Sequence, residues 1–160
     1  MLNLAVLMDN IDNKILTELG RDSRQSTSKI ARKTGIPQTT VHFRIKKMVA
    51  EEVIEKYTIL LNREKIGKSV MAFVLVLYDT NAMKQKNYRY EDTANGIRNI
   101  PGVEEFAYTT GQYDIVIKVT ARSMKELSSV VLEQLRRIPG VFRTETIVVL
   151  DHFSNNILVI

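Results

Sequence analysis

Three stretches in the first third of the chain have the apolar spacing of short amphipathic helices. In residues 9–20, "DNIDNKILTELG", Asp9 is placed to cap a helix and Gly20 to end it. Residues 26–35, "STSKIARKTG", predict a second helix, which Gly35 would end through a left-handed turn. Residues 36–52, "IPQTTVHFRIKKMVAEE", predict a third, whose first turn suits Pro37 because the missing N–H would have no partner there. The positions expected to face the core are Ile11, Ile15, Leu16, Leu19, Ile30, Ala31, Val41, Ile45 and Met48.

From residue 53 onward the pattern is that of strands alternating with helices. "VIEKYTILLN" (residues 53–62) predicts a strand, and a polar link follows it. Further strands are expected over residues 70–79, 103–111, 113–121 and 141–150, with helices over 85–100 and 123–138. Ser123 and Glu126 predict a capping box for the later helix. The order βαββαβ is typical of a ferredoxin-like sheet.

The word "IPGV" occurs twice, at residues 100–103 and 138–141, each time where a helix is expected to end and a strand to begin. Proline stops a helix, and the following glycine can take a conformation closed to other residues. We interpret the repeat as two matched corners of a duplicated fold and not as a ligand-binding motif. The loop "TTGQYD" (residues 109–114) joins two adjacent strands of that fold.

Charge is concentrated in the helical part. The whole chain has a net charge of +5, and residues 21–47 contain eight Lys or Arg against one Asp. Such a segment is typical of polyanion binding, although a solvated helical face has the same composition. The chain has no cysteine and two histidines far apart, so we expect no metal site and no cofactor. No apolar run approaches the length of a membrane span, and we expect a cytoplasmic protein.

The second and third helices, with Gly35 between them, have the dimensions of a helix-turn-helix, a motif that places its later helix in the major groove of double-stranded DNA. Gln38 could pair with adenine and Thr39 with a base edge, whereas Lys46 and Lys47 suit phosphates. Arg44 could contact phosphate or pair with an acid inside the domain, Phe43 could pack or touch a thymine, and Thr27 could bind phosphate or only cap its helix. The full set of expected DNA contacts is Thr27, Ser28, Gln38, Thr39, Thr40, His42, Phe43, Arg44, Lys46 and Lys47.

These features together resemble the Lrp/AsnC family of bacterial and archaeal transcription regulators. The resemblance covers about residues 8–150 and rests on "MDNIDNKILTELGRDSRQSTSKIARKTGIPQTTVHFRIKKM", "VIEKYTILLNREKIG", "TTGQYDIVIKV" and "LRRIPGVFRTETIVVL". It implies an α+β chain with an N-terminal winged helix-turn-helix domain and a C-terminal ferredoxin-like βαββαβ (RAM) domain. We expect the first domain over residues 1–52, a strand and hinge over 53–68, the second domain over 69–152 and a tail over 153–160.

The resemblance also implies partners beyond DNA. In the family, two sheets pack into a homodimer, dimers can form octamers, and small effectors, usually amino acids, bind near the hairpin that corresponds to "TTGQYD". By that correspondence the effector candidates are Thr110, Gly111, Tyr113 and Asp114, with Asp114 suited to an α-ammonium group. Gly111 and Tyr113 could instead serve only the turn and the packing.

Two departures from the family pattern concern the third helix. Pro37 stands where the family usually has a capping serine, and Glu52 stands where it often has glycine, so the helix must end without that residue.

Two other functions remain open at this point. Siroheme decarboxylases resemble this family in fold, but the only histidine of the second half is His152 and the basic residues gather in the first half. An amino-acid sensor without DNA binding is the other, and the basic segment argues against it.

Overall fold

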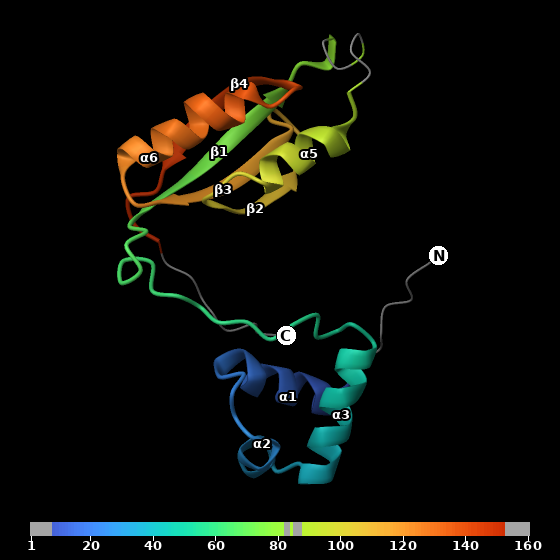
Figure 1. Ribbon diagram of the computed structural model, residues 1–160. Helices are drawn as coiled ribbons and strands as arrows, with labels where there is room; N and C mark the ends of the chain where they lie inside the picture. The colour runs from blue at the N-terminus through green and yellow to red at the C-terminus, as the bar shows by residue number, and fades with distance from the viewer. Residues whose placement is uncertain (1–7, 82–83, 85–87, 153–160) are drawn as a thin grey trace. The chain divides into compact units, whose positions relative to one another are not determined.

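The computed structural model describes residues 8–81, 84 and 88–152, and it divides between Leu60 and Leu61 into two compact units (Figure 1). Each unit has its own apolar core. Residues 1–7 of the expected first domain and the expected tail over 153–160 lie outside the described residues. No described helix combines the length and the apolar character needed to cross a membrane.

The first unit consists of three helices: α1 (Asn10–Arg21), α2 (Thr27–Thr34) and α3 (Gln38–Ala50). Asp9 caps α1 by accepting the N–H groups of Ile11 and Asp12, as expected. Ser26, not Thr27, caps α2, and Gly35 ends it in the left-handed conformation with φ 72°. The prediction that Gly20 ends α1 is wrong, because the helix continues through Arg21. The core contains Ile15, Ile30, Ile36, Val41 and Met48.

The segment after α3 is the main departure from the predicted fold. Residues 51–69 contain no strand, although residues 53–62 were expected to form one, and so no wing accompanies the helix-turn-helix. A strand needs a neighbour to accept and donate its backbone hydrogen bonds, and no described residue pairs with this segment as a strand. Tyr57, Ile59, Leu60 and Leu61 are instead more than half exposed.

The chain leaves α3 through Glu52, which has φ 57° and is the one non-glycine residue with positive φ in the described part of the chain. This is the position at which a glycine was expected from the resemblance. Beyond it, Val53 and Ile54 fold back onto the helical core, and the Ile54 N–H donates to the Met48 carbonyl at 3.0 Å. The helical unit therefore closes without glycine, at the cost of a strained residue.

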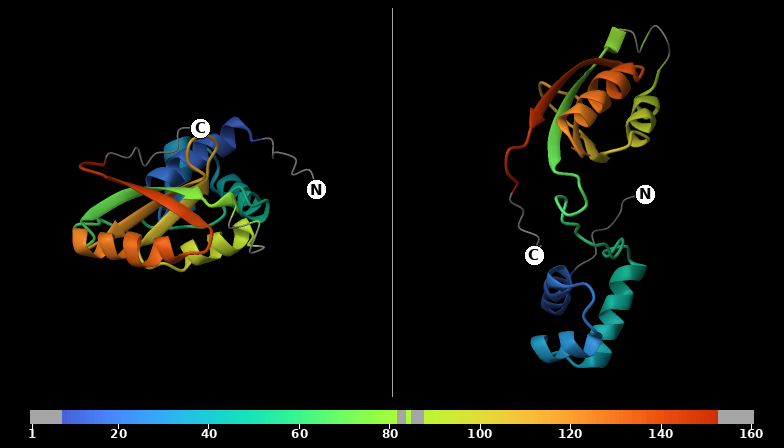
Figure 2. Two further views of the ribbon diagram at one scale, coloured as in Figure 1. Left: turned by 90° about the horizontal axis from the view of Figure 1, so that it is seen from above. Right: turned by 60° about the vertical axis from the view of Figure 1, so that its left-hand side comes forward.

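The second unit is a four-stranded antiparallel sheet with its helices on one face (Figure 2). Its strands are β1 (Val70–Tyr78), β2 (Val103–Tyr108), β3 (Ile115–Ala121) and β4 (Val141–Val148), in the order β2-β3-β1-β4. This is the predicted ferredoxin-like arrangement. The helices are α5 (Tyr90–Arg98) and a longer helix that starts as α6 (Met124–Ser129).

Alternation along the strands separates a buried face from an open one. Ala72, Val74 and Val76 of β1 pack with Ile115 and Ile117 of β3 in the core beneath the helices. The intervening residues of β1 are Phe73, Leu75 and Leu77, which are only half-buried. A register shift between Val103 and Glu105 accounts for the irregular apolar spacing of β2, since an extra residue breaks the alternation.

The two "IPGV" corners match in detail, as predicted. Gly102 and Gly140 have φ values of 92° and 89°. In both corners the valine N–H donates to the carbonyl of the isoleucine three residues earlier, at 3.2 Å. At Gly102 an added Cβ would lie 2.6 Å from the Thr120 carbonyl oxygen, so only glycine fits against β3.

The predicted helix over 123–138 is correct in extent but not regular. It is α-helical over Met124–Ser129, a π-helix (η1) over Val130–Gln134 and a 3-10 helix (η2) over Leu135–Arg137. Ser123 accepts the Glu126 N–H, but the Glu126 carboxylate accepts the Arg122 N–H instead of completing a capping box.

The helix expected over 85–100 starts later, at Tyr90, and residues 85–87 lie outside the described residues. Tyr90, the first residue of α5, contacts two other tyrosines. Tyr90 packs edge-on against Tyr78, with ring centroids 5.0 Å apart, and its carbonyl accepts the Tyr108 hydroxyl at 3.2 Å.

Candidate nucleic-acid interface and effector hairpin

The first turns of α2 and α3 are linked by side chains. Gln38 at the start of α3 donates through Nε2 to the Thr27 hydroxyl at the start of α2, at 3.4 Å. The Ser26 and Ser28 hydroxyls lie 2.9 Å apart beside this contact. Hydroxyl and amide groups, all exposed except the partly buried Thr27, therefore gather where two helix N-termini, with their free N–H groups and positive dipole ends, come together.

The remaining candidates on α3 separate into two groups. Val41 and Met48 are buried, as predicted, which turns the other faces of the helix outward. Phe43 is 65% exposed. Of the two roles expected for Phe43, packing is therefore wrong within the described part of the chain. The exposed candidates of α3 are Gln38, Thr39, His42, Phe43, Lys46 and Lys47, and Thr40 is half-buried.

Arg44 is not available as a simple phosphate contact. Its guanidinium lies 2.8 Å from an Asp9 carboxylate oxygen and 3.1 Å from one of Asp12, and its side chain is only 25% exposed. Of the two roles predicted for Arg44, the structure places it in the internal ion pair. It ties the start of α1 to the middle of α3.

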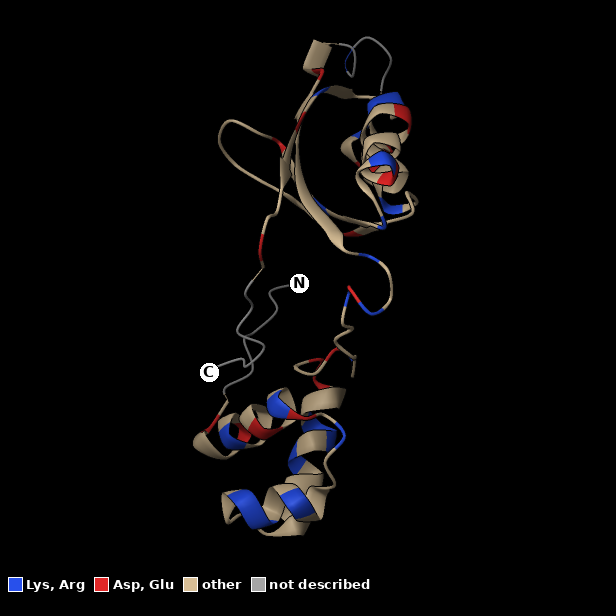
Figure 3. Ribbon diagram, turned by 90° about the vertical axis from the view of Figure 1, so that its left-hand side faces the viewer, with Lys and Arg blue, Asp and Glu red and all other residues tan. Residues whose placement is uncertain are grey.

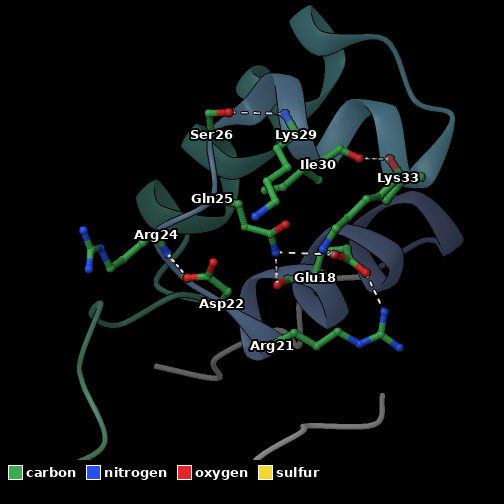
Figure 4. Close-up of polar contacts among 10 residues, drawn as sticks. Glu18, Arg21, Asp22, Arg24, Gln25, Ser26, Lys29, Ile30 and Lys33 are labelled. Carbon is green, nitrogen blue, oxygen red and sulfur yellow. Dashed lines mark hydrogen bonds and ion pairs between the residues drawn. The ribbon is translucent and has the colours of Figure 1, made fainter.

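A second polar cluster joins α1 to α2 around the buried carboxylate of Glu18 (Figure 4). Lys33 donates to Glu18 Oε2 at 2.5 Å, Arg21 donates to Oε1 at 2.6 Å, and Gln25 donates to the Glu18 carbonyl at 2.5 Å. The ammonium group of Lys33 is the main cause that lowers the pKa of Glu18, and desolvation opposes it. The sequence did not predict this role, because helical spacing alone does not show that Glu18 faces inward.

These ion pairs separate the basic residues of the interface into those with a carboxylate partner and those without one. Arg21, Lys33 and Arg44 are held by acids inside the unit, and Lys47 lies 3.8 Å from Glu51. The other cations have no carboxylate partner among the described residues, and two of them lie on α2, which carries no acidic residue (Figure 3). The unpaired cations are Arg24, Lys29, Arg32 and Lys46.

The effector candidates lie on the hairpin between β2 and β3. The Asp114 N–H donates to the Val76 carbonyl at 2.9 Å, and Asp114 Oδ2 accepts the Tyr78 N–H at 2.8 Å. The Thr109 N–H closes the loop on the Asp114 carbonyl at 2.9 Å. One carboxylate oxygen of Asp114 thus anchors the hairpin to β1.

The remaining hairpin residues are accessible. Thr110 and Gly111 are exposed, and Gly111 has φ 114° with no atom within 4 Å of an added Cβ. The Tyr113 hydroxyl donates to the Glu145 carboxylate of β4, an anion that raises the pKa of the Tyr113 phenol. Tyr113 is half-buried, so it serves the packing of the hairpin whatever else it does.

Arg63 fixes the end of the linker to the sheet, an interaction that the sequence did not predict either. Its guanidinium forms two hydrogen bonds to Glu104 of β2, at 3.2 and 2.7 Å, and Thr120 donates to the same carboxylate. The pKa of Glu104 is lowered, chiefly by Arg63. No sequence signal pairs two residues of opposite charge so far apart along the chain.

Comparisons with known proteins match both units of the chain. Family models of the AsnC-type helix-turn-helix domain and of the Lrp/AsnC ligand binding domain match residues 8–49 and 71–158. An uncharacterized HTH-type transcriptional regulator of Pyrococcus furiosus is 40% identical over 146 residues, which are 91% of this chain and 94% of the relative. The HTH-type transcriptional regulator FL11 of Pyrococcus horikoshii is 35% identical over 147 residues, 92% of each chain.

Solved structures show the same fold. E. coli AsnC superimposes with a TM-score of 0.80 at 29% identity, covering 91% of this chain and 94% of AsnC. A transcriptional regulator of Neisseria meningitidis in complex with L-Met superimposes with a TM-score of 0.84 at 23% identity, covering 93% and 94%. With a helix-turn-helix unit and a ligand-binding unit both matched in order, this chain belongs to the Lrp/AsnC family of DNA-binding transcription regulators.

Proposed function

We propose that this regulator binds specific sites in double-stranded DNA as a homodimer, through α3, and that an amino acid bound at the hairpin of the sheet modulates the binding. The observation that carries the proposal is the junction of α2 and α3, where exposed hydrogen-bonding groups gather on two helices that also carry unpaired cations. Such a protein works where the chromosome is, so we expect it in the cytoplasm.

Within this interface we assign different tasks to different side chains. Gln38 and Thr39 lie in the first turn of α3, where a recognition helix meets base edges. Lys29, Arg32 and Lys46 have no carboxylate partner among the described residues, so they are free to replace counterions on phosphates. Arg44 supports α3 through Asp9 and Asp12 and acts as a positioning residue.

The open face of the sheet supports the homodimer. Phe73, Leu75 and Leu77 form an apolar row on that face, and Ile147 beside Phe73 in the β4 register is 48% exposed. Two such faces packed together would bury this surface. A second copy would also supply a neighbour for the exposed linker segment 57–61, whose strand-like sequence has no strand partner in the part of the chain that the structure describes.

The hairpin supports the effector site. Asp114 can receive an α-ammonium group on its remaining carboxylate oxygen, and the open backbone at Gly111 can approach a ligand closely. Thr110 adds an exposed hydroxyl. The Neisseria regulator, in its complex with L-Met, is consistent with an amino-acid ligand.

The alternative functions have less support. A sensor without DNA binding leaves the cations of α2 and α3 without a role. For a siroheme decarboxylase we would expect imidazole groups around the sheet, but the one histidine of the second half of the sequence, His152, is exposed at the end of the described residues.

Selection of bound sequences from random DNA, followed by footprinting with each amino acid in turn, tests the proposal. We expect a pseudo-palindromic site with half-sites about 34–36 Å apart, and a footprint that at least one amino acid changes. Asp114→Asn should remove the amino-acid response and keep the site. Recovery of no preferred sequence would contradict the DNA-reading role, whereas a preferred site with no amino-acid response would contradict the effector role alone.

A further inference from the structure

A groove lies between the irregular helix and the edge strand β4, on the helix side of the sheet and away from the hairpin. Its volume is about 340 Å³, within the range of roughly 300–1,000 Å³ typical of small-molecule sites. Its apolar wall includes Met124, Leu127, Val131, Leu132 and Val148. Leu132 and Met124 are 51% and 56% exposed, so this wall has no cover within the described part of the chain.

The groove coincides with the π-helical stretch η1. Val131 and Leu132 belong to this stretch, and both line the groove. A π-turn is less favourable than an α-turn and is frequently found at functional sites. Here the helix changes its winding where it lines the groove.

One cation stands at the polar side of the groove. Arg136 Nε donates to the Thr144 hydroxyl of β4 at 3.1 Å, which holds the guanidinium beside the apolar wall. Arg136 has no carboxylate partner among the described residues. The residues that line the groove include no acidic side chain.

We propose that this groove is a second ligand site, for a small apolar monocarboxylate without an ammonium group. Arg136 binds the carboxylate, and the apolar wall covers a branched or short linear hydrocarbon tail. A free α-amino acid fits poorly, because no acid in the lining receives its ammonium group. The site is thus distinct in place and in chemistry from the effector site at Asp114, and it does not depend on that assignment.

A ligand series with one carbon skeleton tests the proposal on the full-length protein. Met124 lines the groove, whereas Met48 lies in the core of the other unit, so their methyl groups serve as NMR probe and internal control. We expect 4-methylpentanoate to shift the Met124 signal and leave Met48 unchanged. 4-Methylpentan-1-ol and L-leucine, which change only the head group, should bind the groove at least about tenfold more weakly.

Variants separate the groove from its surroundings. Arg136→Gln should weaken 4-methylpentanoate binding about tenfold, whereas Arg137→Gln, the same change at the neighbouring exposed arginine, should not. Leu132→Glu should abolish the shift by placing an anion in the groove, and Asp114→Asn should preserve it. The proposal would be overturned if the acid and the alcohol bound equally, or if Arg136→Gln did not weaken binding of the acid. It would also be overturned if millimolar ligand caused no shift of the Met124 signal. A shift that follows self-association of the protein instead of ligand concentration would overturn it as well.

Discussion

At the scale of single residues, the chain departs from ideal backbone conformation at one informative position. Glu52 adopts φ 57°, a conformation that costs a side chain with a Cβ atom roughly 1–2 kcal/mol. Its neighbour Glu51 has φ −90° and no such strain. Glycine in place of Glu52 and glycine in place of Glu51 should therefore have opposite effects on the free energy of unfolding.

We predict that Glu52→Gly raises the free energy of unfolding of the helical unit by about 1 kcal/mol. Glu51→Gly should lower it by about 0.5–1 kcal/mol, because glycine gains nothing at negative φ and loses more entropy on folding. Urea unfolding followed at the Met48 methyl group by NMR reports on this core. A stability unchanged in Glu52→Gly would mean that the left-handed exit is not formed in solution.

At the scale of elements, the arrangement of helices and strands could largely be predicted from the sequence, and the exceptions have physical causes. Periodicity located α1, α2, α3 and the four strands of the sheet because each buries one face. It misassigned residues 53–62, since a strand-like sequence forms a strand only beside a partner. It also missed the winding change in η1, because the buried positions Leu127, Val131 and Leu135 remain spaced as in an ordinary helix.

The candidate sites were less predictable than the elements. The exposed positions of α3 follow from its apolar stripe, and these were anticipated. The pairing of Arg44 with Asp9 and Asp12, and of Lys33 with Glu18, depends on how the helices pack and could not be derived from spacing. As a result, the sequence overstated how many cations are free for DNA.

The Glu18 cluster makes the packing of α1 against α2 sensitive to acid. The pKa of the Glu18 carboxyl is lowered in the folded unit. The stabilisation that its ionised form gives is therefore present above the ordinary carboxyl pKa of about 4.3 and is lost as the pH falls through the lower folded value. We predict that protection of the Ile30 amide from hydrogen exchange falls between pH 5 and pH 3 in the natural chain. Glu18→Gln should reduce protection at pH 5 and flatten that pH dependence in part, since Asp9 also has a lowered pKa.

Glu51→Gln is the matched control for this experiment, because Glu51 lies 3.8 Å from Lys47 at the surface and shows no comparable burial. It should leave the acid response as it is. An Ile30 amide equally protected at pH 5 and pH 3 would show that the Glu18 cluster contributes nothing to the packing of these helices.

At the scale of the whole molecule, the unit that contacts DNA and the sheet that would join two copies are separate bodies on one chain. The apolar open face of the sheet and the linker, which has no strand partner among the described residues, are the grounds for the proposed dimer. A dimer supplies two α3 helices, which a pseudo-palindromic site requires.

We predict that Leu75→Glu converts the dimer into monomers in sedimentation velocity, because it places a carboxylate in the apolar row, opposite Glu145 of β4. Leu132→Glu, on the helix side of the same sheet, should leave the dimer intact. Circular dichroism checks that both variants remain folded. A folded Leu75→Glu protein that is still dimeric would move the interface away from this face.

The most direct test of α3 as the DNA-reading helix compares the DNA affinity of two α3 variants. Fluorescence anisotropy measures the affinity for the selected site and for sites with single base changes, each at several salt concentrations. Gln38→Ala should cost about 1–3 kcal/mol on the selected site and reduce discrimination at one base pair in each half-site. Lys46→Ala should weaken all sites alike and reduce the slope of log K against log salt by about one for each phosphate that the lysine neutralises. If Gln38→Ala leaves every base preference unchanged and Lys46→Ala leaves the salt slope unchanged, α3 is not the helix that reads DNA.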